Sequence, residues 1–275
     1  MKTWLITGCS SGIGEGIAKA VLKKGDQAVV TARNPEKLAD LVKDYPDTAF
    51  AVALDVTSKE SIRNAVKEAL NKFGTIDVLI NNAGYGYRSS VEEGEIEGVN
   101  QLFDTNFFGP IELIKEVLPT MRANKSGAIV NVSSIAAVRS AVGSGYYAAS
   151  KAALELMTDG LAKELKPLGI KVMIVQPGSF RTHFYDTSLQ GTNKKIDDYA
   201  ETAGKTRKEN VVNMKNQPGD PIKGGEVIVE MVEREDCPFR LLLGSDATRI
   251  VSEALKERIQ EIENYKEISA KSDFE

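Results

Sequence analysis

The chain has 275 residues, of which 42% are hydrophobic and 27% charged, and its 35 basic and 39 acidic residues give a net charge of −4. These values are ordinary for a soluble globular protein, and the acidic balance argues against a nucleic-acid-binding protein. Two cysteines and one histidine supply neither a disulfide framework nor a His-rich zinc site, so we expect no metal.

Strand-like sequence begins at Lys2, which leaves no room for a signal peptide, and no apolar run approaches the length of a membrane span. We therefore expect a cytoplasmic protein without a membrane partner. The first predicted strand, residues 3–7, is followed at once by Gly8-Cys9-Ser10-Ser11-Gly12-Ile13-Gly14, after which apolar residues recur at helical spacing.

Glycines in such a turn allow a tight bend and close backbone approach, and the N–H groups and dipole of a helix N-terminus attract a pyrophosphate. The turn therefore predicts a phosphate cradle. Its residues are Gly8, Ser10, Ser11, Gly12, Ile13 and Gly14.

The same residues match the G-x-S-x-G nucleophile elbow of a hydrolase, in which Ser10 would be the nucleophile and His183 its base. That site needs an oxyanion-hole loop from an earlier strand, and no strand precedes this one in the sequence given. We therefore favour the phosphate cradle over the hydrolase.

The second predicted strand, residues 28–31, ends in Ala32-Arg33-Asn34-Pro35. In nucleotide-binding folds an acid near this point binds the ribose 2′-hydroxyl, whereas an arginine accommodates a 2′-phosphate. No acid stands here, so Arg33 favours NADP(H) over NAD(H). The alternative is that Arg33 only caps the strand end in solvent.

Further strands are predicted at residues 48–54, 76–80, 129–132, 170–175 and 240–243. Helical patterns lie between them at residues 58–72, 106–121 and around 147–151, and an amphipathic helix is predicted at about 246–265. Strands that alternate with helices indicate βαβ units with right-handed crossovers. We expect one α/β domain over residues 1–275, with a doubly wound parallel sheet of about seven strands and helices on both faces.

Residues 183–218 break this rhythm, because they are polar and exceed the usual length of a connection. We expect a mobile lid over a moderately large, largely apolar substrate. Its aromatic start would face the fourth strand's loop (His183, Phe184 and Tyr185 against Tyr85 and Tyr87). Its basic residues suggest a solvated, weakly anchored outer face (Lys194, Lys195, Lys205, Arg207 and Lys208). The alternative is a fixed surface excursion whose aromatic residues fill the core.

Tyr147 and Lys151 are four residues apart and so share one helix face. An ammonium beside a phenol favours the phenolate and lowers the pKa of the tyrosine. Tyr147 is therefore a candidate proton donor for carbonyl reduction, or base for alcohol oxidation, and Ser134 could hold the substrate oxygen. The same spacing occurs by chance in many helices, so the assignment depends on the rest of the chain.

These motifs together resemble the short-chain dehydrogenase/reductases, in the single-domain branch with T-G-x-x-x-G-x-G, here Thr7 to Gly14. The resemblance is close over residues 2–182 and loose beyond them. It implies a Rossmann-type sheet and hydride transfer between NADP(H) and a carbonyl or secondary alcohol. The family's catalytic four match Asn106, Ser134, Tyr147 and Lys151.

The resemblance also implies roles for other residues. Asn106 would hold a water in a proton relay, Lys151 the nicotinamide ribose, and Thr182 the nicotinamide carboxamide. Ser133 and Tyr146 fall out of register with the motif. The remaining cofactor contacts implied are Asp55, Val56, Asn82, Ala83, Gly84, Pro177, Gly178 and Phe180.

Three questions stay open at this point. The sequence is similar to members grouped with hydroxysteroid and retinol dehydrogenases, but the fold hosts many substrates. A non-enzymatic NADP(H)-binding regulator is the competing class, although it would need only the cofactor half of the motifs. The apolar stripe Val251, Leu255, Ile259 and Ile262 either packs against its own sheet or forms a contact in a homo-oligomer.

Overall fold

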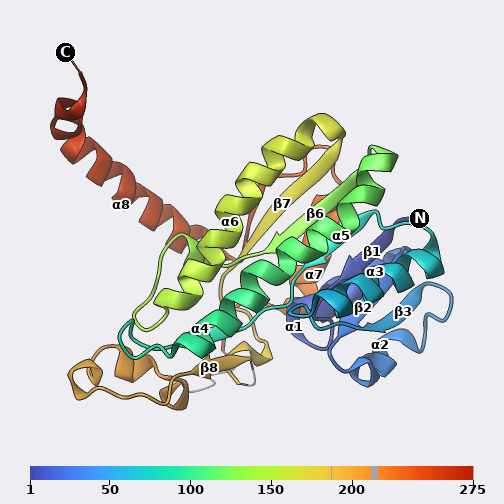
Figure 1. Cartoon of the computed structure of the whole chain (residues 1–275), viewed down its shortest axis with the longest axis horizontal. Helices are drawn as coiled ribbons and strands as arrows, with labels where there is room; N and C mark the ends of the chain where they lie inside the picture. Colours follow the sequence, from blue (N-terminus) through green and yellow to red (C-terminus); the bar gives the residue numbers. More distant parts are fainter. Residues whose placement is uncertain (187, 212–215, 275) are drawn as a thin grey trace.

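Near-continuous apolar strands build the core of the computed structural model, which describes residues 1–186, 188–211 and 216–274. Seven parallel strands form one sheet in the order β3-β2-β1-β4-β6-β7-β9 (Figure 1). This confirms the predicted doubly wound α/β fold. The strands are β1 Thr3–Ile6, β2 Gln27–Ala32, β3 Ala49–Ala53, β4 Val78–Asn81, β6 Gly127–Val132, β7 Ile170–Pro177 and β9 Arg240–Leu243.

Helices cover both faces of the sheet (Figure 1). Because side chains alternate along a strand, Trp4 and Ile6 of β1 pack on one face with α1 and α7, and Leu5 packs on the other with α3 and α5. All three side chains are fully buried. The helices are α1 Gly12–Lys24, α2 Ala39–Val42, α3 Lys59–Phe73, α4 Ile96–Phe103, α5 Gly109–Asn124, α6 Gly145–Leu165, α7 Pro221–Glu233 and α8 Ser245–Ser269.

Helices α1 and α7 touch through glycines. A Cβ added to Gly225 would lie 2.1 Å from the Gly16 carbonyl carbon, and one added to Gly16 would lie 2.1 Å from the Pro221 oxygen. Any side chain at either position would push the helices apart. The short distance between these helices therefore depends on the absence of Cβ atoms.

Two short strands escaped sequence analysis. Strand β5 (Gly86–Arg88) pairs in parallel with β8 (Leu189–Gly191) and forms a separate two-stranded sheet. Three residues are too few to show a periodic pattern. The helical pattern expected from Asn106 also begins earlier, because α4 runs through a π turn (Asp104–Phe108) into α5.

The segment after β8 is held to the loop before α4 by a buried glutamate. Glu93 is fully buried and accepts hydrogen bonds from the backbone N–H groups of Ile196 (2.9 Å) and Ser90 (3.2 Å). It also forms an ion pair with Arg207. Burial raises the pKa of Glu93, but these donors outweigh it and lower the pKa to about 2.

Two details of the predicted lid are therefore wrong. Arg207 is buried against Glu93 and is not solvated. Tyr87 does not face the aromatic start of the segment, because its ring packs edge-on against Tyr146. The predicted range includes residues 187 and 212–215, which lie outside the described residues.

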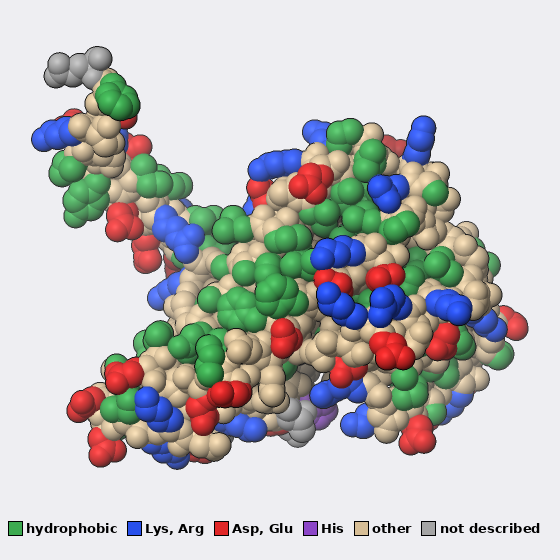
Figure 2. Space-filling view, in the orientation of Figure 1, with side chains coloured by type: hydrophobic (Ala, Val, Ile, Leu, Met, Phe, Trp, Pro, Cys, Tyr) green, Lys and Arg blue, Asp and Glu red, His purple; other side chains and the backbone are tan. Residues whose placement is uncertain are grey.

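Helix α8 packs on the body only through its first part. Val251 and Ala254 are 4% and 5% exposed, whereas Ile259 and Ile262 are 60% and 65% exposed. The second half projects away from the body and presents apolar side chains to solvent (Figures 1 and 2). Packing against the body therefore accounts for only Val251 of the predicted stripe, because Leu255 is also 45% exposed. Among the described helices, none is long and apolar enough to cross a membrane.

We expect deletion of residues 259–275 to change the free energy of unfolding of the monomer by less than about 1 kcal/mol, because residues 259–274 are exposed. Val251→Ala should cost about 1–3 kcal/mol, because it leaves a cavity under the helix. Urea unfolding followed by circular dichroism measures both. A loss of unfolding free energy from the deletion as large as that from Val251→Ala would contradict this expectation. If the native protein is an oligomer and the deletion variant is a folded monomer, the stripe is a subunit contact.

Candidate active site

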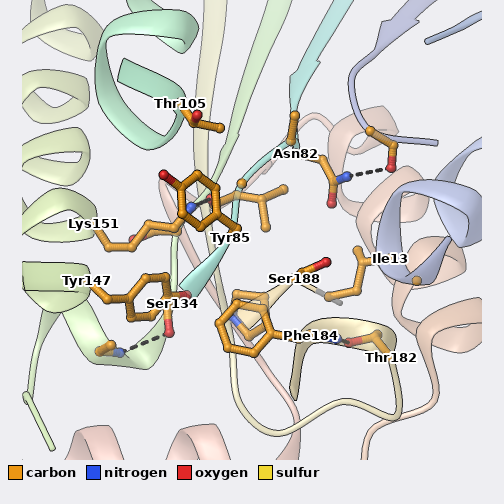
Figure 3. Close-up of a pocket in the computed structure, with 18 of the residues that line it drawn as sticks. Ile13, Asn82, Tyr85, Thr105, Ser134, Tyr147, Lys151, Thr182, Phe184 and Ser188 are labelled. Atoms are coloured by element: carbon orange, nitrogen blue, oxygen red, sulfur yellow. Dashed lines mark hydrogen bonds between the residues drawn. The ribbon is translucent and has the colours of Figure 1, made fainter. Parts of the chain in front are cut away.

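A cavity of about 1080 Å³ opens at the carboxyl ends of the parallel strands. Residues that directly follow β1, β2, β3, β4, β6 and β7 contribute to its wall. Every predicted catalytic or cofactor residue lines it except Gly14 and Asn106. Ile13, Asn82 and Thr182 lie on one side of the view in Figure 3, and Ser134, Tyr147 and Lys151 on the other.

The glycine turn after β1 requires residues without side chains. Gly8 and Gly12 have φ angles of 72° and 66°, in the left-handed region that favours glycine. A Cβ added to Gly14 would lie 2.3 Å from the Gly8 oxygen, so the tight packing of the turn requires glycine at this position although Gly14 does not line the cavity. Ser11 precedes α1 but its side chain makes no capping bond, which leaves the first N–H groups of this helix available for an anion.

Thr7 and Asn82 hold this turn against the end of β4. The Thr7 hydroxyl accepts hydrogen bonds from the backbone N–H groups of Asn82 and Ala83, both at 2.9 Å. The Asn82 amide donates to the carbonyl oxygens of Thr7 (2.8 Å) and Gly8 (3.2 Å). The two segments therefore keep a fixed relative position.

The ends of β2 and β3 supply one charge of each sign. Arg33 is exposed at the cavity edge, and among the described residues no carboxylate lies within ion-pair distance of it. The Asp55 carboxylate accepts from the backbone N–H (2.9 Å) and hydroxyl (2.7 Å) of Thr57, and Val56 beside it is buried. These residues could hold the adenosine half of a dinucleotide, with Arg33 free to meet a phosphate.

Tyr147 and Ser134 lie beside each other in the cavity wall (Figure 3). Ser134 is fixed because its Oγ accepts a hydrogen bond from the Ala136 N–H at 3.1 Å. Burial raises the pKa of Tyr147 to about 12, even though the Ser134 side chain and the charge of Arg88 act to lower it. The phenol therefore keeps its proton at neutral pH.

Lys151 does not act on Tyr147 as the sequence suggested. Its ammonium donates to the Val132 carbonyl oxygen at 2.9 Å, and it is not among the groups that shift the pKa of Tyr147. Burial lowers the pKa of Lys151 to about 8, although the charge of Glu155 raises it. The predicted lowering of the tyrosine pKa by this lysine is therefore wrong for this structure.

Asn106 lies behind the cavity wall in the π turn and is fully buried. Its amide oxygen accepts from the Tyr85 N–H at 3.1 Å, and its amide nitrogen donates to the Tyr85 carbonyl (3.0 Å) and to Ser150 (3.2 Å). A Cβ on Gly84 would lie 3.0 Å from the amide oxygen and 3.3 Å from the Lys151 ammonium. Asn106 thus supports the wall beside Lys151.

The neighbours of the two motif residues point elsewhere. Ser133 is buried and donates to Glu155 at 2.7 Å, and Tyr146 donates to the Val91 carbonyl at 2.7 Å. Tyr146 does not line the cavity, whereas Ser133 does line it but has its hydroxyl engaged by Glu155. The hydroxyls of Ser134 and Tyr147 are therefore the pair that meets the cavity.

The loop after β7 closes the side of the cavity opposite Tyr147. Thr182 lies against Gly12, since a Cβ on that glycine would be 3.1 Å from the Thr182 methyl group. Phe180 is 7% exposed and fills the space left by Gly219 and Gly224. Its role is mainly to pack this loop, with Pro177 and Gly178 at the cavity edge.

Several cavity residues were missed by sequence analysis. They include Arg88 of β5, Gln190 of β8, Ile250 of α8 and Ser144 before α6, and no motif marks them. Their positions are set only by the fold. Phe184 and Tyr185, which were expected at the start of the lid, also line the cavity, and Phe184 packs on the Tyr147 ring with centroids 5.6 Å apart.

The hydrolase alternative finds no support in the geometry. Ser10 and His183 both line the cavity, yet no hydrogen bond joins them in the part of the chain that the structure describes. A glycine cradle, an exposed arginine at the second strand and a Ser–Tyr–Lys group instead fit an extended nicotinamide dinucleotide. Among the described residues, no three His, Cys, Asp or Glu side chains gather at a metal-binding distance.

Comparison with known proteins agrees with this geometry. Residues 2–193 match the family model for short chain dehydrogenases. The chain is 35% identical over 98% of its length to oxidoreductase BOA17 of Botryotinia fuckeliana, of which the match covers 99%. A short-chain dehydrogenase from Streptomyces avermitilis has a similar structure, with a TM-score of 0.92, 41% identity and coverage of 99% of this chain and 98% of that one.

Two other similar structures contain nicotinamide cofactors. An alcohol dehydrogenase from Thermococcus sibiricus, complexed with 5-hydroxy-NADP, has a TM-score of 0.73 and 25% identity, over 88% of this chain and 96% of that one. A 3-ketoacyl-(acyl-carrier-protein) reductase from Brucella melitensis, complexed with NADH, has a TM-score of 0.75 and 27% identity, over 90% and 98%. With the cavity, the fold and these matches in agreement, the chain belongs to the short-chain dehydrogenase family of oxidoreductases.

Proposed function

We propose that the protein reduces a carbonyl substrate with NADPH and that Tyr147 is its general acid. The observation that carries this proposal is that Ser134 and Tyr147 line the same cavity as the glycine turn and Lys151. The 3-ketoacyl reductase among the similar structures supports a ketone as the acceptor.

When bound, the cofactor supplies the hydride, and the protein's part is orientation and charge. The glycine turn and the N-terminus of α1 would hold the pyrophosphate, and Thr182 with Lys151 the nicotinamide half. Ser134 would donate a hydrogen bond to the substrate oxygen, and Tyr147 would transfer its proton to that oxygen as negative charge develops there. Lys151 and Asn106 would return a proton to Tyr147 through water.

The protonated phenol favours the reductive direction. Burial keeps the pKa of Tyr147 near 12, so almost every molecule carries the proton at neutral pH. A general acid is then ready without any prior ionisation. Alcohol oxidation would instead need the phenolate, which this environment disfavours.

A panel of aldehydes and ketones tests the proposed function directly. We expect the native protein to consume NADPH with at least one acceptor in the panel and to yield the alcohol. Tight binding of NADPH with no turnover of any acceptor would favour the non-enzymatic regulator.

We expect Tyr147→Phe to lower kcat by about 10²–10⁴-fold, because it removes the proton donor. NADPH binding, followed by the change in nicotinamide fluorescence, should stay close to the native value. Tyr146→Phe is the matched control, since its hydroxyl bonds to Val91 outside the cavity. Full turnover by Tyr147→Phe together with an inactive Tyr146→Phe would contradict the assignment of Tyr147 as the general acid.

Preference for NADP(H) is a separate proposal that depends on Arg33. This guanidinium is exposed at the cavity edge, and the residues directly after β2, Arg33-Asn34-Pro35, include no acid. Since one similar structure carries an NADP derivative and another carries NADH, the family alone leaves the choice open.

We expect Arg33→Ala to raise the KM for NADPH by about 10–100-fold, because a charge-assisted contact with the 2′-phosphate is lost. The KM for NADH should change far less. Lys37→Ala is the control, because this nearby lysine is exposed and does not line the cavity. Equal KM values of the native enzyme for the two cofactors would remove the proposal.

We also propose that residues 183–186 form the moving part of the predicted lid. They follow Thr182 directly, and Phe184 packs on Tyr147. The outer part of the segment is held by the pairing of β8 with β5 and by the buried Glu93–Arg207 ion pair. Closure near the nicotinamide would exclude water from hydride transfer.

Hydrogen exchange tests this division. We expect amide exchange at residues 183–186 to slow when NADPH and a reducible ketone are added, while residues 189–191 stay protected throughout. High protection at residues 183–186 that neither ligand changes would rule out the moving lid.

A further inference from the structure

Arg88 lies at the substrate end of the cavity, and among the described residues no carboxylate forms an ion pair with it. It is the last residue of β5, and its side chain lines the cavity. Its Nε atom is fully shielded from solvent and has no hydrogen-bond partner among the described residues. Burial lowers the pKa of the guanidinium, although the nearby Tyr185 and Tyr147 hydroxyls oppose this shift. A charge partly withdrawn from water without a counter-ion is costly to stability, so its position suggests a ligand.

The surrounding charges leave this arginine available. Among the described residues that line the cavity, the acids are Asp55 and Asp104. Asp55 belongs to the end of β3 and is engaged by Thr57, and Asp104 lies in the π turn beside Tyr85. Neither forms an ion pair with Arg88.

A second unsatisfied group lies on the same side of the cavity. Ser144 precedes α6, is 3% exposed and lines the cavity, yet its hydroxyl has no partner among the described residues and makes no capping bond. A 3.1 Å hydrogen bond from the Ser89 N–H to the Gly143 carbonyl joins the segments that carry Arg88 and Ser144. The uncapped N-terminus of α6 adds N–H groups and a positive dipole end there.

Aromatic and apolar side chains lie near the reacting centre. Phe184 packs on the Tyr147 ring and stacks edge to face on Tyr185 with ring centroids 5.3 Å apart, and Val142 and Ile250 also belong to the cavity lining. The substrate end therefore combines one hydrogen-bonding site for an anion with apolar surface near Tyr147.

We propose that Arg88, assisted by Ser144 and the N-terminus of α6, binds a carboxylate of the substrate, so that the substrate class is a keto acid with an apolar body. The planar fork of a guanidinium matches the two oxygens of a carboxylate. This inference rests on the proposed carbonyl reduction. The carbonyl carbon gains the hydride, the carbonyl oxygen gains the Tyr147 proton, and the product is the hydroxy acid with its carboxylate unchanged.

Matched acids and esters test the proposal. The probes are 4-oxopentanoate, 5-oxohexanoate and 6-oxoheptanoate, each beside its methyl ester, which keeps the ketone and removes the charge. The native enzyme should show a higher kcat/KM for at least one acid than for its ester. Arg88→Met should lower that acid-to-ester ratio by about 10–100-fold, the loss typical of a hydrogen bond to a charged group.

Further variants separate a specific site from general attraction. Arg88→Lys keeps the charge without the fork and should retain part of the preference. Ser144→Ala should lower the ratio by about 2–10-fold, because it removes a neutral donor. Arg139→Met removes an exposed positive charge from the rim of the same cavity and should change the ratio by less than about threefold. An equal effect of Arg139→Met and Arg88→Met would overturn the specific site.

Calorimetry provides a readout that does not need turnover. The acids should bind the native protein saturated with NADP⁺ more tightly than the esters do, and Arg88→Met should abolish the difference. Equal binding of acid and ester, or a difference that survives in Arg88→Met, would overturn this proposal. Reduction of the esters together with equal binding would leave carbonyl reduction intact, whereas selective binding of the acids without turnover would count only against the reaction.

Discussion

The hydrogen bonds between Thr7 and Asn82 are the constraint on which the rest of the site depends. They join the ends of β1 and β4, the central strands of the sheet, through two backbone N–H groups at 2.9 Å and an amide donor at 2.8 Å. Gly14 packs against the Gly8 oxygen and the Asn82 amide with no room for a Cβ, so any other residue at position 14 would push this junction apart. The glycine turn follows Thr7, and Gly84 follows Asn82. The junction between Thr7 and Asn82 therefore holds the cofactor half and the catalytic half of the site in a fixed relative position.

A second set of buried polar contacts holds the catalytic half in position. Asn81 donates to Asn131 at 2.8 Å and Asn131 donates to Thr158 at 2.8 Å, which ties β4 and β6 to α6. Ser133 donates to Glu155 on the same helix. Since these partners are fully or nearly fully buried, a shift of α6 would leave polar groups unsatisfied. The register of α6 therefore fixes Tyr147, rather than Tyr146, as the tyrosine that lines the cavity.

An arginine side chain lies at each end of the cavity. Arg33 lies at the adenosine end, where Asp55 is engaged by Thr57, and Arg88 lies at the substrate end. Between them, burial keeps Tyr147 protonated and lowers the pKa of Lys151 to about 8. Such a cavity suits an anionic cofactor and an anionic substrate with a proton donor between their reacting ends.

The sequence by itself determined the parallel sheet, the glycine turn and the shared helix face of Tyr147 and Lys151. Each of these follows from local periodicity or from spacing within a short segment. Only the tertiary structure decided what depends on distant partners. Glu93 and Arg207 are 114 residues apart, and the three-residue strands β5 and β8 exist only because they pair with each other. The direction of the Tyr147 pKa shift and the exposure of Arg88 to the cavity depend likewise on burial by loops from several parts of the chain, which no local pattern records.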